Sequence, residues 1–249
     1  MGRVSARASL ASLVALLAAV ACSTSRPAAT TPAEHVASTK PDEHHHQHGG
    51  HGQASGPLVH RFEDAARWSA VFDGAARDAW QRPDEVVKLL EIAPGMTVVD
   101  LGAGTGYFEA RLSRAVGPAG KVLALDVEPD MVRWMRERAA REGLANVHAE
   151  TIAYDDPGLA AGTVDRVLVV DTWHHIPSRE AYAAKLRDAL APGGWVAIVD
   201  FDLDAAEGPP REHRIAPEQV VRELAAGGLV AAPVTESLAQ QYVVVGRRR

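Results

Sequence analysis

The sequence predicts an α/β fold with a mostly parallel sheet, preceded by a separate N-terminal segment. Three observations support this prediction. From residue 83 onward, helical and strand-like patterns alternate, separated by short stretches of glycine and proline. The run 164–170 is almost continuously apolar, as expected of a strand that is covered on both faces. The composition, 47% hydrophobic and 23% charged, is typical of a globular protein with a buried core.

The predicted elements follow one another in the order of βα units. Apolar residues at helical spacing predict helices that begin at Pro83, near Phe108, at Pro129, before Tyr182 and at Pro217. Strands are predicted at 97–101, at 121–126, from about Val147, at 164–170 and at 195–201. Two last runs, 229–234 and 241–245, are predicted to pair as a C-terminal antiparallel hairpin.

The first 22 residues are typical of an export signal. Arg3 and Arg7 precede an apolar run, 8–21, that is shorter than the roughly 20 residues of a membrane-spanning helix. The run ends before Cys22, the single cysteine of the chain. This ending resembles a bacterial lipoprotein signal, in which the cysteine carries the lipid; a simple signal peptide or an uncleaved anchor is the alternative. We therefore expect a lipid-anchored protein of the cell envelope, or a cytoplasmic one if this segment is not a signal.

Residues 23–57 are rich in small and polar side chains and are predicted to form a disordered tether. The tether contains a cluster of five histidines: His44, His45, His46, His48 and His51. Because neutral imidazole binds zinc, copper or nickel, the cluster is a candidate metal-binding segment, with a soluble spacer as the alternative. The folded domain is expected to span 58–249, without a metal site. Its acidic character, within a net charge of −6 for the chain, argues against nucleic acid as a partner.

The sharpest motif follows the first predicted strand. It consists of an acid, Asp100, and a glycine loop, Gly102-Ala103-Gly104-Thr105-Gly106. Glycines let the backbone turn tightly and let a ligand approach it closely. A dinucleotide-binding fingerprint requires its third glycine at position 107, where this chain has Tyr107. Since Asp100 repels a pyrophosphate and attracts an amine, the motif favours a nucleoside cofactor that has a cationic amine and no phosphate.

A second acid, Asp126, ends the next predicted strand. A carboxylate at this position can accept hydrogen bonds from both hydroxyls of a ribose. A solvated loop acid is the alternative. The distance of Asp126 from the glycines along the chain favours the ribose-binding role.

From about Asp78 to Val245, the sequence resembles the class I S-adenosylmethionine-dependent methyltransferases. The resemblance rests on four stretches: VDLGAGTG (99–106), ALD (124–126), VDRV (164–167) and LAPGG (190–194). It implies a Rossmann-like, doubly wound sheet of seven mostly parallel strands, with one antiparallel strand near its edge. It also implies S-adenosylmethionine as the cofactor and methyl transfer to an acceptor as the reaction.

The resemblance assigns roles to particular residues. Asp100 and the glycine loop would hold the methionine part of the cofactor, and Asp126, with Val127 next to it, would hold the ribose. Residues 78–83 would form a flap over the cofactor. Many relatives place an acid on the adenine where this chain has Ala153, so Asp155 or the adjacent Asp156 is expected to take that role.

The acceptor is expected to bind near residues 170–177, at the carboxyl end of the central strand. His174 or His175 is a candidate general base for a protonated oxygen or nitrogen; the alternative is that one of them caps the following turn. Asp171 is expected to orient the cofactor or the loop. The predicted reaction is a direct in-line displacement that depends mainly on alignment, with a small molecule or a lipid as the acceptor.

Two other functions remain open at this point. The domain could bind the cofactor without transferring methyl groups, because an exported enzyme has no obvious supply of a cofactor that is made in the cytoplasm. The chain could instead handle metals in the envelope through the histidines of its tether.

Overall fold

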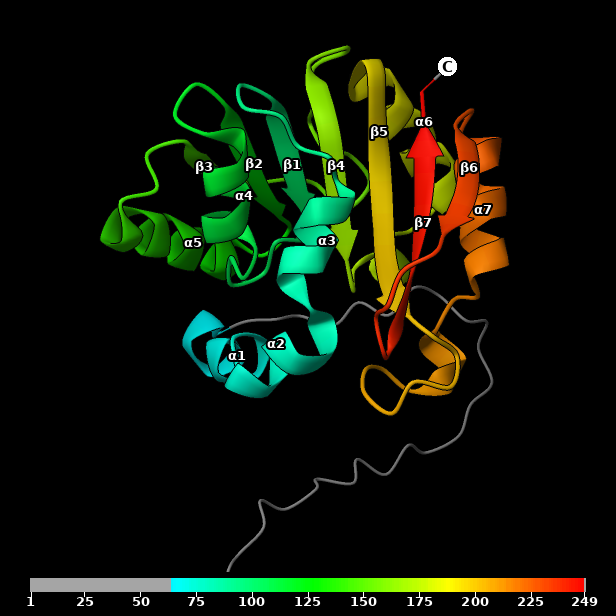
Figure 1. Ribbon diagram of the computed structural model, residues 1–249, viewed down its shortest axis with the longest axis horizontal. Helices are drawn as coiled ribbons and strands as arrows, with labels where there is room; N and C mark the ends of the chain where they lie inside the picture. The colour runs from blue at the N-terminus through cyan, green and yellow to red at the C-terminus, as the bar shows by residue number, and fades with distance from the viewer. Residues whose placement is uncertain (1–63, 249) are drawn as a thin grey trace, which may run out of the picture. The chain divides into compact units, whose positions relative to one another are not determined.

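The computed structural model of the chain describes residues 64–248 (Figure 1). The predicted signal segment 1–22, the tether 23–57 with its histidines and the start of the predicted domain lie outside the described residues, so these assignments stay predictions. Within residues 64–248, no helix is long and apolar enough to cross a bilayer.

Seven strands form one sheet in the order β3-β2-β1-β4-β5-β7-β6. Their bounds are β1 (Thr97–Leu101), β2 (Lys121–Asp126), β3 (Val147–Thr151), β4 (Val164–Val170), β5 (Leu190–Phe201), β6 (Val230–Val234) and β7 (Gln241–Arg247). β1 to β5 pair in parallel, and β7 pairs antiparallel with both β5 and β6. The predicted Rossmann-like sheet with a C-terminal antiparallel hairpin is confirmed.

Helices cover both faces of the sheet and close its lower edge (Figure 1). Their bounds are α1 (Ala65–Phe72), α2 (Ala75–Gln81), α3 (Pro83–Leu89), α4 (Glu109–Val116), α5 (Pro129–Glu142), α6 (Arg179–Ala189) and α7 (Pro217–Ala226), with short 3-10 helices at Trp173–His175 and Arg211–His213. Buried side chains of α3, α4 and α5 share one core with the sheet, and those of α6 and α7 share the other. The sheet is therefore doubly wound.

The central strand β4 shows why this sequence needs helices on both faces. Leu168 and Val170 belong to the core on the side of α3 to α5, whereas Val167 and Val169 belong to the core on the side of α6 and α7. Three of these four side chains are fully buried, and Val170 is nearly so. Burying a side chain of this kind contributes about 1.5–3 kcal/mol, so a polar residue on either face of β4 would destabilise the fold.

Two differences from the predicted elements arise from local geometry. β5 begins at Leu190 rather than at 195, because Leu190 pairs with Val164 before the register shifts at a bulge. α1 and α2 were not predicted, and they lie below the sheet in Figure 1, at the carboxyl ends of the parallel strands.

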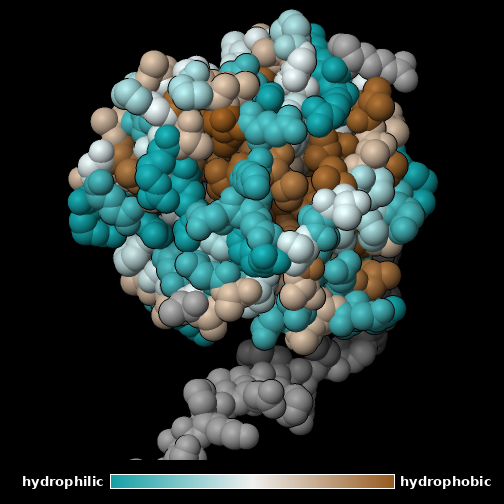
Figure 2. Space-filling view, in the orientation of Figure 1, coloured by the Kyte–Doolittle hydropathy of each residue, from teal (hydrophilic) through white to brown (hydrophobic). Residues whose placement is uncertain are grey.

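Figure 2 shows the surface of the protein in the orientation of Figure 1. Apolar residues gather in the upper centre of this view, over the sheet, whereas the lower part near α1 and α2 is mostly hydrophilic.

Candidate functional site

The glycine loop joins β1 to α4. Gly102, Gly104 and Gly106 all have positive φ angles, a conformation that other residues rarely adopt. A Cβ on Gly102 would lie 2.3 Å from the side chain of Thr172, and a Cβ on Gly106 would lie 2.7 Å from Oε2 of Glu109. At these two positions only glycine fits, so the loop presents bare backbone at the carboxyl end of β1.

Contacts with neighbouring elements fix the shape of this loop. The N–H groups of Gly102 and Ala103 both donate to the carbonyl of Leu125 in β2, at 2.8 and 3.1 Å. Thr105 is buried, and its hydroxyl donates to Oδ1 of Asp73 at 3.0 Å, in the connection between α1 and α2. Ala103 and Thr105, both predicted as site residues, thus hold the loop in place, the first through its backbone and the second through its side chain.

Asp126 ends β2 beside the glycine loop. Its Oδ2 accepts the N–H of Gly104 at 2.8 Å, and its Oδ1 accepts the N–H of Glu128 at 2.9 Å. Burial raises the pKa of Asp126, and hydrogen bonds from the backbone of Glu128, Gly104 and Val127 oppose the rise. Each carboxylate oxygen can accept a second hydrogen bond, so Asp126 is oriented by the backbone and retains acceptor positions for a vicinal diol.

Asp100 and Glu109 place two buried carboxyl groups beside the loop. Among residues 64–248, no hydrogen-bond donor meets Oδ2 of Asp100 or either side-chain oxygen of Glu109. Burial raises the pKa of Asp100 to about 7, although Arg77 lowers it and Asp126 adds to the rise. Burial and the charge of Asp100 raise the pKa of Glu109. Buried carboxyl oxygens without a donor are costly, so this site fits a ligand that brings a cationic amine to Asp100.

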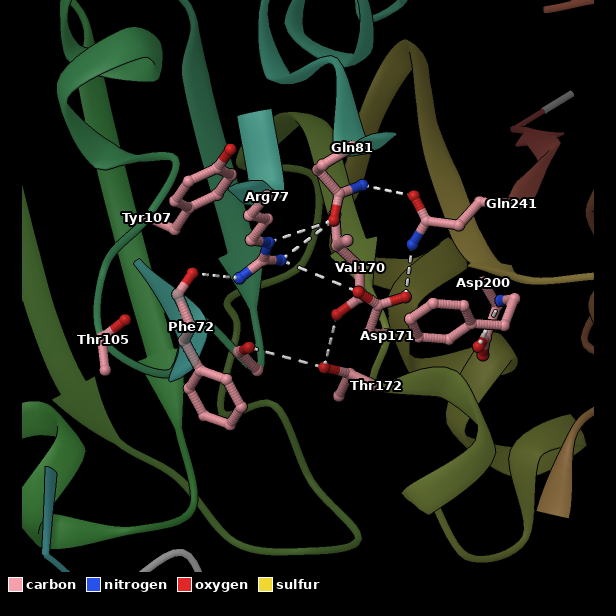
Figure 3. Close-up of polar contacts among 12 residues, drawn as sticks. Phe72, Arg77, Gln81, Thr105, Tyr107, Val170, Asp171, Thr172, Asp200 and Gln241 are labelled. Carbon is pink, nitrogen blue, oxygen red and sulfur yellow. Dashed lines mark hydrogen bonds and ion pairs between the residues drawn. The ribbon is translucent and has the colours of Figure 1, made fainter. Parts of the chain in front are cut away.

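Arg77 of α2 places a cation close enough to Asp100 to lower its pKa, and Figure 3 shows its guanidinium beside Gln81 and Asp171. Its Nη1 donates to the carbonyl of Phe72 at 2.9 Å, and its Nε donates to Oε1 of Gln81 at 3.2 Å. Its guanidinium carbon lies 4.1 Å from the centroid of the Tyr107 ring. The guanidinium is therefore held at a fixed position in the site, where it can receive a carboxylate.

Asp171 follows β4 directly and joins α2 to the C-terminal strand. It adopts a left-handed backbone conformation, with φ of 52°, which is uncommon outside glycine. Its Oδ2 lies 3.7 Å from Nη2 of Arg77, and its Oδ1 accepts the amide N–H of Gln241, which in turn accepts from Gln81 (Figure 3). Burial and the charge of Asp200 raise the pKa of Asp171 to about 7, against the lowering effect of Arg77.

The two candidate base residues have different surroundings. His174 is buried, and its Nδ1 lies 3.0 Å from both Oδ1 and Oδ2 of Asp200, at the end of β5. The His175 ring lies beside it, with 4.2 Å between the ring centroids. The structure therefore brings an acid to His174 on the same edge of the sheet as the glycine loop and Asp126.

The predicted adenine ligand lies in a more exposed region. Asp155 is exposed in the loop after β3, and its carbonyl accepts a hydrogen bond from Nζ of Lys185 at 2.6 Å. The neighbouring Asp156 side chain pairs with the same lysine at 3.1 Å. The assignment of either acid to an adenine stays a prediction.

Four residues of the site were not predicted: Arg77, Glu109, Asp200 and Gln241. The predicted flap begins at Asp78, one residue after Arg77, because the resemblance begins there. Asp200 stands near the end of a strand, as Asp126 does, so the rule that identified Asp126 would also have identified Asp200. Gln241 is the first residue of β7, and no local pattern in the sequence distinguishes it.

The raised pKa values predict an unusual dependence of stability on pH. Asp100 and Asp171 hold their protons more tightly in the folded state than an ordinary aspartate does. Their stabilising contribution is therefore complete below about pH 4 and is lost as the pH rises through about 7. We expect the free energy of unfolding of the cofactor-free protein to fall by roughly 1–3 kcal/mol between pH 5 and pH 7, measured by urea denaturation.

The matched variant for this measurement is Asp100→Asn, which keeps the shape of the neutral acid and cannot ionise. It should reduce the fall between pH 5 and pH 7 and leave the part that Asp171 contributes. If stability of the unsubstituted protein instead increases with pH over this range, the buried acids are ionised without penalty.

Comparisons with known proteins agree with this geometry. Residues 98–194 match a family model described as a methyltransferase domain. The chain is 30% identical over 128 residues to a ubiquinone/menaquinone biosynthesis C-methyltransferase of Hydrogenovibrio crunogenus, a match that covers 49% of this chain and 48% of the relative. It is 28% identical to the nocamycin O-methyltransferase of Saccharothrix syringae, over 66% of this chain and 54% of the relative. The chain thus spans about half the length of the curated relatives it matches.

A solved structure extends the similarity to nearly the whole described domain. The crystal structure of an S-adenosylmethionine-dependent methyltransferase from Aquifex aeolicus superposes with a TM-score of 0.70 at 28% identity, covering 75% of this chain and 99% of that one. The segment that matches the family model, 98–194, contains the glycine loop, Asp126 and the central strand β4. Residues 98–194 therefore match a methyltransferase domain, and S-adenosylmethionine is the cofactor.

Proposed function

We propose that this protein transfers the methyl group of S-adenosylmethionine to a small acceptor by direct in-line displacement. The observation that carries the proposal is the convergence of Asp100, Asp126 and Arg77 on one glycine loop, at the carboxyl ends of parallel strands. These groups complement the amine, the ribose diol and the carboxylate of a single ligand. When bound, the cofactor supplies a methyl carbon that its sulfonium already activates.

Some residues would bind the parts of the cofactor, and others would enclose the site. Asp126 would accept the ribose hydroxyls, Asp100 would accept the amine, and Arg77 would receive the carboxylate. Helix α2 lies over the carboxyl ends of the strands. Its Trp80 packs on Phe201, the last residue of β5, with 5.7 Å between ring centroids. Enclosure of this kind excludes water and favours alignment of the acceptor atom with the methyl carbon.

The relatives leave the acceptor open. One is named a C-methyltransferase of ubiquinone and menaquinone biosynthesis, and another is named an O-methyltransferase of nocamycin. Their names differ in the atom that is methylated. Neither name identifies the acceptor of this protein. The proposal therefore specifies the cofactor and the type of displacement, with a small molecule as the acceptor.

Arg77 provides the test of this binding scheme. Isothermal titration of the intact protein should show binding of S-adenosylmethionine and S-adenosylhomocysteine. Arg77→Met should weaken the binding of S-adenosylmethionine by about tenfold, because a charged hydrogen bond to the ligand carboxylate is lost. Decarboxylated S-adenosylmethionine should bind the variant and the unsubstituted protein with equal affinity, since it lacks the group that Arg77 receives.

Arg67→Met is the matched control, because Arg67 is exposed on α1 and lies over the ring of Trp68. It should leave both affinities unchanged. Absence of binding of either cofactor form at millimolar concentration would overturn the proposed function. An equal loss of both ligands in Arg77→Met would remove Arg77 from the carboxylate-binding role.

A further inference from the structure

The pair formed by His174 and Asp200 has no part in the cofactor scheme described above. His174 lies in the 3-10 turn directly after β4, and Asp200 lies near the end of the neighbouring strand β5. Their side chains are only 3% and 1% exposed. Both oxygens of the acid lie 3.0 Å from the same ring nitrogen, Nδ1. An acid and a histidine are thus buried together at the functional edge of the sheet.

A histidine that only fills space in the core does not require a buried acid. Burying a carboxylate is costly unless hydrogen bonds and an opposite charge compensate, and Asp200 has few other compensating contacts. Its other hydrogen bond within residues 64–248 is accepted from the backbone N–H of Phe201, at 2.9 Å. The Asp200 carboxylate therefore interacts mainly with His174. Its hydrogen bond places the proton of the neutral imidazole on Nδ1. The lone pair of the neutral ring then lies on Nε2.

The turn that carries His174 also contacts the glycine loop. Thr172, two residues earlier, packs against Gly102 and donates a hydrogen bond to its carbonyl at 3.4 Å. Asp171 lies between the glycine loop and His174. It faces Arg77 on one side, and on the other its charge raises the pKa of His174. His174 therefore stands on the β4 and β5 side of the site, across from the sugar-binding acid on β2.

We propose that His174 is the general base of the transfer and that Asp200 is its positioning residue, so that the acceptor atom is an oxygen or nitrogen that carries a proton. The inference rests on the proposed function. The electron pair of the acceptor atom forms the bond to the methyl carbon, and the bond from that carbon to sulfur breaks with its electrons left on sulfur. The proton of the acceptor goes to Nε2 of His174. Acceptors whose reacting atom has no proton, such as thioethers, do not need this pair.

The charges around His174 determine what a substitution should change. Burial by itself lowers the pKa of His174, but the hydrogen bond and charge of Asp200, together with the charge of Asp171, raise it on balance. Arg179 of α6 opposes the rise, and the His175 ring lies beside the His174 ring, tilted by 43°. Removing the charge of Asp200 should therefore lower the pKa of His174, and restoring a carboxylate should raise it again.

The test is a titration of the intact protein labelled with ¹⁵N in its histidines and observed by long-range ¹H–¹⁵N correlation. The His174 signals are those lost in His174→Gln. We expect the neutral ring to carry its proton on Nδ1, and Asp200→Asn to lower the pKa of His174. Asp200→Glu should recover most of the shift. His148, exposed on β3, is the internal control whose titration should not respond.

Binding of S-adenosylhomocysteine to the same samples separates this inference from the proposed function. Asp200→Asn should bind it within about twofold of the unsubstituted protein, because the acid is placed on the acceptor side. A proton on Nε2 of the neutral ring, or a titration that Asp200→Asn leaves unchanged, would overturn the pair even if the cofactor binds. Failure of the unsubstituted protein to bind would contradict the proposed function whatever His174 does.

Discussion

Asp126→Ala is expected to weaken the binding of S-adenosylmethionine by roughly 10- to 150-fold, which corresponds to the loss of hydrogen bonds to a charged acceptor. The carboxylate is oriented by the N–H groups of Gly104 and Glu128, so little order is lost when the ribose binds. Isothermal titration with S-adenosylhomocysteine gives the affinity directly. The variant should remain folded, because Asp126 lies at the end of its strand.

Asp130→Ala is the matched control for this measurement. Asp130 lies in the first turn of α5, close to Asp126 along the chain, and its side chain is 45% exposed and pairs with Arg133. Its loss should leave the affinity unchanged, since a surface ion pair of this kind contributes little. Equal affinities of Asp126→Ala and the unsubstituted protein would remove Asp126 from the ribose-binding role.

Gly102→Ala is expected to lower the free energy of unfolding by roughly 2–5 kcal/mol. Two costs add. The φ angle of 73° is unfavourable for alanine, and the new Cβ would lie 2.3 Å from Cγ2 and Oγ1 of Thr172. The measurement is urea denaturation of the intact protein, with the slope of the transition compared between variants.

Gly158→Ala separates these two costs. Gly158 also has a positive φ, of 63°, but no atom lies within 4 Å of the position of its Cβ. Its substitution should cost only about 1–2 kcal/mol. Adding Thr172→Ala to Gly102→Ala should recover part of the loss, because it removes the two atoms that collide. If Gly102→Ala costs no more than Gly158→Ala, the close approach of Thr172 to the loop is not as described.

The parts of the site that the sequence predicted are those that a local pattern encodes. Asp100, the glycine loop and Asp126 stand next to buried strands, and parallel strands bring their carboxyl ends to one edge of the sheet. The seven-stranded, mostly parallel sheet and the C-terminal hairpin followed from the alternation of elements and from the resemblance. For these features, short segments and one rule of sheet topology were sufficient.

The parts that were missed depend on contacts between distant segments. Arg77 reaches the site only because α2 packs across the carboxyl ends of the strands, and α2 has no strong helical pattern in seven residues. His174 and His175 are adjacent in sequence and cannot be ranked without knowing that Asp200 lies beside the first. Gln241 joins the network because β7 pairs antiparallel with β5. Each of these contacts requires the tertiary structure.

The central claim is that one ligand joins the glycine loop, Asp126 and Arg77. A crystal structure of the intact protein grown with S-adenosylhomocysteine tests it most directly. The account predicts the ribose hydroxyls on the Asp126 carboxylate, the amino-acid part along Gly102 to Gly106, and the ligand carboxylate at Arg77. A ligand bound elsewhere, or a loop still covered by the protein's own side chains at saturating ligand, would contradict the account.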